Sequence, residues 1–193
     1  MLTNSLNSKR PHNYSNDLLD SISFRALPVI GFKMEIKNFF IDNQWSRIQE
    51  LKPYIEYQNK LRIGVGYCWL KKGHVLSDSL QIKISAINFF VSYRYYVSNK
   101  WLIDIPLDFG FGRIKKLHDR QTLKKGYYSF YEPNMIVEFR GFKYFNLGFG
   151  TGLRLTTSDK EVYSINLTRQ TIIFRFGLKF NEIYKSIFNP IES

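Results

Sequence analysis

The three histidines are the side chains best suited to acid–base chemistry in this sequence, and they stand far apart, at positions 12, 74 and 118. His118 or His74 beside the hydroxyl of Ser129 or Ser77 could form a nucleophilic site, because an imidazole can accept the proton of a serine. No spacing of His, Asp and Glu matches the ligand shell of a metal ion. We therefore expect no enzyme activity, no metal and no cofactor, with a serine–histidine site as the less favoured alternative.

Asp104 and Asp108 form a pair of carboxylates within one predicted strand. A separation of four residues on a strand places both on one face, about 13 Å apart, which is too far for them to share a proton. Salt bridges are the better interpretation. The single cysteine, Cys68, excludes an intramolecular disulfide and a Cys-ligated zinc site, and we interpret it as an inert small side chain.

The chain carries 28 Lys and Arg against 16 Asp and Glu, and this net charge of +12 suits an anionic partner. The densest basic cluster lies at a predicted strand end and in the loop after it, and consists of Arg113, Lys115, Lys116, His118, Arg120, Lys124 and Lys125. We expect five of these to contact lipopolysaccharide phosphates, at about 1 kcal/mol each by analogy with anionic lipid surfaces. The five are Lys115, Lys116, Arg120, Lys124 and Lys125. A solvated loop is the alternative.

Nucleic acid is not expected as a partner. Such a role needs aromatic stacking residues beside basic ones on one accessible face, and here the aromatic residues lie on the opposite face of each strand.

Alternation of apolar with polar or small residues indicates that strands position these side chains. The alternation is strong in residues 61–69, 101–112, 145–156 and 172–180. It is weaker in residues 28–41, 47–58, 82–97 and 127–140. An aromatic content of 17% also favours strands. The sequence therefore predicts an all-β protein with about eight strands.

Turns and loops of two lengths alternate between these strands. The short turns are expected at residues 58–60, 98–100 and 141–144, and the longer polar loops near residues 43–47, 72–81, 117–126 and 158–167. Short turns at one end and long loops at the other are typical of an antiparallel up-and-down transmembrane β-barrel.

Three arguments place the apolar face of the strands outside. The interior of an eight-stranded barrel is just wide enough for side chains to fill, so about six large residues per strand cannot point inward. Glycines gather on the polar face, where they leave room for long charged side chains. The polar face also carries both signs of charge, which can neutralise each other as a buried network.

The predicted lumen network consists of Arg62, Arg94, Asp104, Asp108, Glu132, Glu138, Arg140, Arg154 and Arg175, with Lys33, Lys37, Lys52, Lys179, Glu35 and Glu56 on the same face. The alternatives are a narrow pore for small solutes, a lipid A-modifying barrel enzyme, and a soluble β-sandwich or lipocalin-like binding barrel whose charged face is solvated.

Two stretches carry a resemblance to a known class of proteins. Leu147-Gly-Phe-Gly-Thr-Gly-Leu-Arg-Leu155 and Arg175-Phe-Gly-Leu-Lys-Phe180 resemble strands of the small outer-membrane β-barrel proteins of Gram-negative bacteria, particularly those of Bacteroidetes-like genomes. The second stretch is similar to the polar-x-Gly-x-x-aromatic part of the last-strand insertion signal. The resemblance implies an outer-membrane protein of structural or surface-interaction type, inserted by the barrel-assembly machinery.

The resemblance divides the chain into a polar N-terminal segment, 1–27, a barrel, 28–180, and a C-terminal tail, 181–193. Residues 1–20 lack the charged start and apolar stretch of a signal peptide, and a truncated or misassigned start at Met1 would reconcile this with export. We expect a monomer whose partner is membrane lipid.

Overall fold

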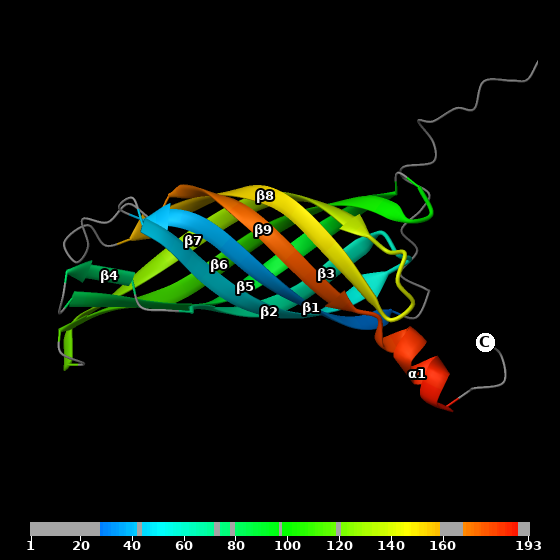
Figure 1. The fold of residues 1–193 in the computed structure, drawn as a ribbon, viewed down its shortest axis with the longest axis horizontal. Helices are drawn as coiled ribbons and strands as arrows, with labels where there is room; N and C mark the ends of the chain where they lie inside the picture. Colours follow the sequence, from blue (N-terminus) through cyan, green and yellow to red (C-terminus); the bar gives the residue numbers. More distant parts are fainter. Residues whose placement is uncertain are drawn as a thin grey trace, which may run out of the picture.

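The computed structural model describes residues 28–41, 44–71, 74–77, 80–96, 98–118, 121–158 and 168–188. The described elements are β1 (Val29–Ile41), β2 (Gln44–Tyr57), β3 (Leu61–Leu70), β4 (His74–Ser77), β5 (Leu80–Tyr96), β6 (Trp101–His118), β7 (Gln121–Phe139), β8 (Phe145–Ser158), β9 (Arg169–Leu178) and α1 (Phe180–Phe188). The strands form a barrel whose axis is horizontal in Figure 1. Among the described residues, no helix is long and apolar enough to cross a membrane.

All strand pairings are antiparallel, and the pairing of β1 with β9 closes the ring. β3 and β4 both pair with β5, so that β4 continues the line of β3 after a short interruption. The nine strands therefore occupy eight positions around the ring. This confirms the predicted up-and-down barrel of about eight strands.

The three predicted short turns lie at one end of the barrel, on the right in Figure 1. In the first of them Gln58 and Asn59 have φ angles of 49° and 59°, and the amide of Lys60 donates a 2.9 Å hydrogen bond to the carbonyl of Tyr57. Two consecutive residues with positive φ give the turn a twist that matches that of the flanking strands.

The prediction of a long loop at residues 117–126 is wrong. β6 continues to His118 and β7 begins at Gln121, and these two residues form the last pair of the two strands. Only residues 119–120 between them lie outside the described part. Apart from Arg120, the basic cluster is therefore carried by a paired ladder, whose backbone hydrogen bonds need no apolar alternation.

The barrel wall inverts its polarity along β5. Near the short turns the inward side chain of Arg94 is buried and charged, whereas Tyr95 is 59% exposed on the outside. Near the other end Ile82 and Ile84 are buried inside, and Lys83 between them is exposed outside. The end of the wall from Ser85 to Leu80 therefore has the pattern of a barrel surrounded by water.

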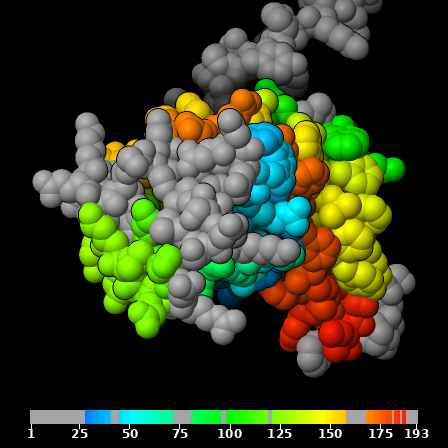
Figure 2. Space-filling model, turned by 60° about the vertical axis from the view of Figure 1, so that its left-hand side comes forward, coloured from blue at the N-terminus to red at the C-terminus, as the bar shows by residue number. Residues whose placement is uncertain are grey.

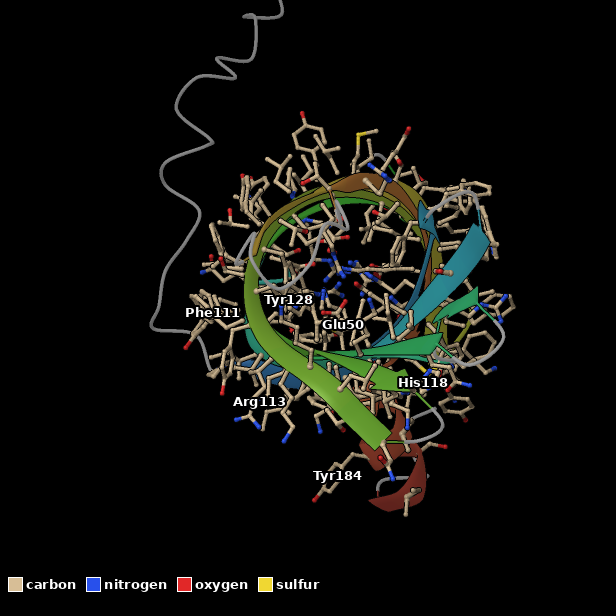
Figure 3. The ribbon with its side chains drawn as sticks, turned by 90° about the vertical axis from the view of Figure 1, so that its left-hand side faces the viewer. Glu50, Phe111, Arg113, His118, Tyr128 and Tyr184 are labelled. Carbon is tan, nitrogen blue, oxygen red and sulfur yellow. The ribbon has the colours of Figure 1, made fainter. Side chains whose placement is uncertain are left out.

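The inner apolar cluster fills the half of the lumen away from the short turns and consists of Phe39, Ile48, Cys68, Leu70, Ile82, Ile84, Ala86, Ile114, Tyr128 and Phe130. The sequence analysis placed polar residues inside throughout, so it missed this cluster. Tyr128 lies inside the ring in Figure 3, viewed along the barrel axis. The long side chains need small neighbours: a methyl group on Gly64 would lie 2.7 Å from the ring of Phe90.

The helix α1 follows β9 directly; its first residue, Phe180, ends the predicted barrel, and the rest of the helix lies in the predicted tail. Its apolar residues Phe180, Ile183, Tyr184 and Ile187 recur at helical spacing, and Glu182 lies in its first turn. This spacing gives a helix with one apolar stripe, and a carboxylate near the N-terminus complements the helix dipole.

Candidate functional site

The charged side chains inside the barrel balance each other in number. Among the described residues, seven cationic and seven anionic side chains are buried: Lys33, Lys37, Lys52, Arg62, Arg94, Arg154 and Arg175 against Glu35, Glu50, Glu56, Asp104, Asp108, Glu132 and Glu138. Figure 3 shows Glu50 inside the ring. The lumen network is neutral, so the charge of +12 resides in the other residues of the chain.

Two ammonium groups form the centre of the network. The Nζ atom of Lys37 lies 2.9 Å from carboxylate oxygens of both Glu50 and Asp108, and that of Lys52 lies 2.9 Å from Glu35 and 2.8 Å from Asp108. Carboxylate oxygens of Glu35, Glu50 and Asp108 all lie within 4.8 Å of one another, a spacing that could suit a metal ion. Because the two ammonium groups already neutralise these oxygens, we interpret the cluster as ionic packing.

Arg175 connects three carboxylates on different strands. Its Nη2 atom lies 2.6 Å from Glu35 on β1, and its Nη1 atom lies 3.2 Å from Glu138 on β7 and contacts Asp104 on β6. The guanidinium group is planar and offers several donors, so one side chain can satisfy acceptors from opposite sides of a lumen.

Arg154 on β8 forms an ion pair with Glu132 on β7. Its Nη2 and Nε atoms donate hydrogen bonds of 2.5 and 2.8 Å to one oxygen of Glu132. Glu132 also lies 3.2 Å from the Nζ atom of Lys37 and accepts a 3.2 Å hydrogen bond from Thr171. The guanidinium lies 4.4 Å from the centre of the Phe130 ring, at the boundary with the inner apolar cluster.

The lumen opens at the short-turn end into a small cavity of about 110 Å³. Arg62 and Arg94, which line it, each lie 2.7 Å from Glu56. Arg140 and Lys179 also line this mouth and are half-buried, since β7 and β9 end just before them. Eight of the nine residues predicted for the network thus lie inside the lumen, and Arg140 lies at its rim.

Glu50 is the buried carboxylate that the sequence analysis did not assign to the network. It lies two residues before Lys52 on β2, and residues two apart on a strand share a face, so the alternation could have placed Glu50 in the lumen. Lys33 was assigned to the polar face but is weakly paired: its Nζ atom lies 3.7 Å from Glu35 and 4.0 Å above the centre of the Phe90 ring.

The structure shows where the cysteine, the aspartate pair and the histidines of the sequence analysis lie. Cys68 is buried in the inner apolar cluster, and Asp104 and Asp108 bind different cations, Arg175 and Lys37. His118 pairs with Gln121 at the end of β6, whereas Ser129 pairs with Phe111. Seven residues of β6 separate these two positions, or about 23 Å, so a His118–Ser129 pair cannot form. The side chains of His74 and Ser77 lie outside the described part.

A row of three lysines crosses the outer wall at the end opposite the short turns. Lys83 on β5, Lys115 on β6 and Lys125 on β7 are direct register partners, and all three are exposed. We call them the basic row. No ion pair is found for any of them among the described residues. Like charges directly opposite each other on adjacent strands are destabilising, so the row favours an anion.

The other predicted basic contacts lie close to this row. Lys116 and Lys124 are register partners at the next position, Lys116 half-buried and Lys124 exposed. Arg120 lies outside the described residues. In Figure 2 the end of the β6–β7 hairpin, in green and yellow-green, stands at the rim that faces the viewer. Sequence analysis missed Lys83, because only the strand register shows that it joins Lys115 and Lys125.

An outer groove lies directly below the basic row, with a volume of about 900 Å³. It is lined by Tyr67, Ser85, Ala86, Ile87, Phe111, Gly112, Arg113, Tyr127, Tyr128, Ser129 and Thr157. Small side chains form its floor, while Phe111 and Tyr127 are 75% and 70% exposed at its sides. The guanidinium of Arg113 lies 5.8 Å from the Tyr127 ring centre, and Figure 3 shows Arg113 and Phe111 outside the ring.

Below the groove the outer wall is apolar. On β6 the outward positions from Trp101 to Phe111 are apolar or aromatic throughout, and the next outward residue is Arg113. A wall with an apolar outside and an ionic inside is stable only where the outside is not in contact with water.

Solved structures share this architecture. Neisserial surface protein A matches with a TM-score of 0.61 and 11% identity, over 78% of this chain and 96% of that chain. The N-terminal β-barrel domain of Pseudomonas aeruginosa OprF matches with a TM-score of 0.52 and 5% identity, over 79% and 98%. The fold is that of a small transmembrane β-barrel. No family model and no curated protein matches the sequence.

The apolar run of this transmembrane barrel has the length that a bilayer requires. A transmembrane strand spans with 9–11 residues at a tilt of about 45°, and residues 101–111 of β6 meet this requirement. Arg113 follows directly on this run, and the basic row lies one outward position beyond Arg113.

Proposed function

We propose that the protein is an outer-membrane barrel of a Gram-negative bacterium that acts through its surface, by binding the phosphates of lipopolysaccharide at the end opposite the short turns. The observation that carries the proposal is the basic row Lys83–Lys115–Lys125 on the outer face of the wall, next to its apolar run. Three neighbouring cations, for which no ion pair is found among the described residues, suit a phosphorylated lipid at headgroup depth. The resemblance to outer-membrane barrels of Bacteroidetes-like genomes supports the location.

The outer groove supports the same ligand class. Its apolar sides, Phe111 and Tyr127, lie between the basic row and the apolar wall. An amphiphile with phosphates at one end and acyl chains at the other would place its phosphates on the lysines and an acyl chain in the groove. Each cation near an anionic headgroup contributes about 1 kcal/mol.

The filled lumen favours surface interaction over transport. The ionic network occupies the half near the short turns, and the inner apolar cluster occupies the other half. Neither half leaves a polar path along the axis of an eight-stranded barrel. We therefore propose a protein with neither a transport nor a catalytic role.

Membrane insertion is tested first. The purified protein should need detergent to remain monodisperse, and its folded form should migrate differently from its boiled form on a gel. A protein that stays monodisperse in plain buffer would contradict the proposal.

Lipid binding is tested with the triple variant Lys83→Gln/Lys115→Gln/Lys125→Gln. A triple variant at the short turns, Lys60→Gln/Lys100→Gln/Lys143→Gln, is the control, because it makes the same change in charge at the opposite end of the barrel. The probes are lipid A and dephosphorylated lipid A, added to the barrel in neutral detergent.

The loss of three phosphate contacts should weaken lipid A binding by about 100-fold at low salt, the equivalent of about 3 kcal/mol. The control variant should bind like the wild type, and dephosphorylated lipid A should not distinguish the variants. Without lipid A, the basic-row variant should unfold at equal or higher denaturant concentration, since like-charge repulsion is removed. Equal lipid A affinity of the two triple variants would refute the site.

A further inference from the structure

The helix α1 presents an exposed apolar stripe. Phe180, Tyr184 and Ile187 are 42%, 61% and 64% exposed, and they lie on one side of the helix at spacings of four and three residues. Exposed apolar residues in one stripe usually mark a contact surface. This stripe lies at the short-turn end, opposite to the basic row (Figure 1).

The strand register fixes the depth at which the helix begins. Leu178, the last residue of β9, pairs with Phe145 on β8, and the amide of Lys179 donates a 2.9 Å hydrogen bond to the carbonyl of Tyr144. The helix α1 therefore begins, with Phe180, at the level of the turn that joins β7 to β8.

An aromatic cluster marks that level on the outside of the barrel. The ring of Phe142 lies 5.5 Å from that of Phe139 and 4.4 Å from that of Phe145, which in turn lies 5.5 Å from Phe176. Aromatic girdles of this kind lie at the membrane–water interface of transmembrane barrels. The helix consequently leaves the barrel at the interface of the bilayer leaflet on the short-turn side.

The other side of the helix is held against the barrel. The hydroxyl groups of Ser186 and Tyr144 form a 3.1 Å hydrogen bond, which together with the nearby Lys143 lowers the pKa of the Tyr144 phenol. The Nζ atom of Lys179 donates hydrogen bonds to the carbonyls of Arg140 and Phe142. Figure 3 shows α1 outside the ring, with Tyr184 pointing away from the wall.

From this geometry we infer that α1 is an interfacial anchor whose stripe of Phe180, Tyr184 and Ile187 inserts into the phospholipid surface of the leaflet on the short-turn side. The depth of Phe180, at the level of the aromatic girdle, identifies the occupant as lipid. A short amphipathic helix of this kind lies at the boundary between headgroups and acyl chains.

The inference is tested by site-directed spin labelling of the full chain in nanodiscs. Each disc holds one barrel in phosphatidylethanolamine and phosphatidylglycerol, so that a second copy cannot cover the helix. The labelled variants are Tyr184→Cys and Ile187→Cys, each with Cys68→Ala. Asn99→Cys, in a short turn at the same end, is the water control, and Phe149→Cys, on the apolar wall, is the lipid control.

Labels at positions 184 and 187 should be several-fold more accessible to oxygen, relative to a water-soluble nickel complex, than the label at position 99. Adding Ile187→Glu to the Tyr184→Cys variant should shift the label toward nickel accessibility, because a carboxylate in the stripe opposes insertion. The folded band on gels should remain unchanged in all variants, which shows that the barrel itself is intact.

The controls separate the failure of this inference from failure of the proposed membrane location. If label 149 is lipid-accessible while labels 184 and 187 behave like label 99, the helix lies in water and the anchor is refuted. Shielding of positions 184 and 187 from both reagents would mean contact with protein, which also refutes it. If label 149 is itself accessible to nickel, the barrel is not in the membrane and both ideas fail.

Discussion

Replacing Arg154 by leucine tests the inside-out assignment of the whole barrel. Arg154 and Glu132 are 3% and 0% exposed and are joined by two hydrogen bonds to one carboxylate oxygen. Removal of one member of a buried ion pair costs roughly 3–5 kcal/mol, because the other charge is left without its partner. Glu132 keeps contacts with Lys37 and Thr171 at 3.2 Å, so we expect a loss near the lower end, about 3 kcal/mol.

The double variant Arg154→Leu/Glu132→Gln should recover much of this loss. It removes the uncompensated carboxylate, so its unfolding free energy should lie within about 1.5 kcal/mol of the wild type. The assay is equilibrium unfolding in urea with the barrel in detergent or vesicles, followed by tryptophan fluorescence and by the folded band on gels. Lys143→Leu, on an exposed turn, is the control and should change the free energy by less than about 0.5 kcal/mol.

A loss below about 0.5 kcal/mol for Arg154→Leu would refute the reasoning. A charged face in contact with water would screen this pair and make the substitution nearly neutral. A double variant that is no more stable than the single variant would instead show that packing against Phe130, and not the stranded charge, carries the effect.

Phe149 is 56% exposed on the apolar wall, so Phe149→Arg should lower the unfolding free energy by about 2–4 kcal/mol in a bilayer. Phe149→Leu should lower it by less than about 1 kcal/mol. Equal unfolding free energies for both variants would place this wall in water. Lys52→Met should destabilise the barrel by about 3 kcal/mol or more, because Lys52 joins Glu35 to Asp108. Lys33→Met should cost less than about 1 kcal/mol, because Lys33 is weakly paired. The reverse order in urea titrations would contradict the network. In planar bilayers the reconstituted protein should give no conductance steps, since both halves of the lumen are filled, and reproducible steps would overturn the plugged interior.

The sequence predicted the part of the barrel in which alternation is enforced by lipid outside and charge inside. Arg154 between Leu153 and Leu155 shows the pattern clearly, because each side of the strand faces a different environment. Near the other end that contrast disappears. Ile84 is inside and Lys83 is outside, so an assignment of apolar residues to the outside cannot apply there.

The parts of the site that the sequence could not predict depend on register between strands. Lys83 and Lys115 are 32 positions apart in the chain, and only the antiparallel pairing of β5 with β6 brings them face to face. The same holds for the three carboxylates that converge on Arg175. The helix α1 was missed for a different reason: its apolar spacing follows directly on the alternation of β9, and the two periods overlap at Phe180.

The apolar wall between the aromatic girdle and Arg113 has a consequence for the membrane around the protein. An eleven-residue run on β6, tilted by about 45°, covers roughly 25 Å, the height of the apolar band of outer-membrane barrels. A single helix can adjust to a thicker or thinner bilayer by tilting, but a closed ring of paired strands around a filled lumen cannot change its tilt without breaking its register. The lipids must therefore stretch or compress to meet this barrel. With Arg113 and the basic row fixed at one edge and α1 at the other, the protein imposes a local thickness on the membrane.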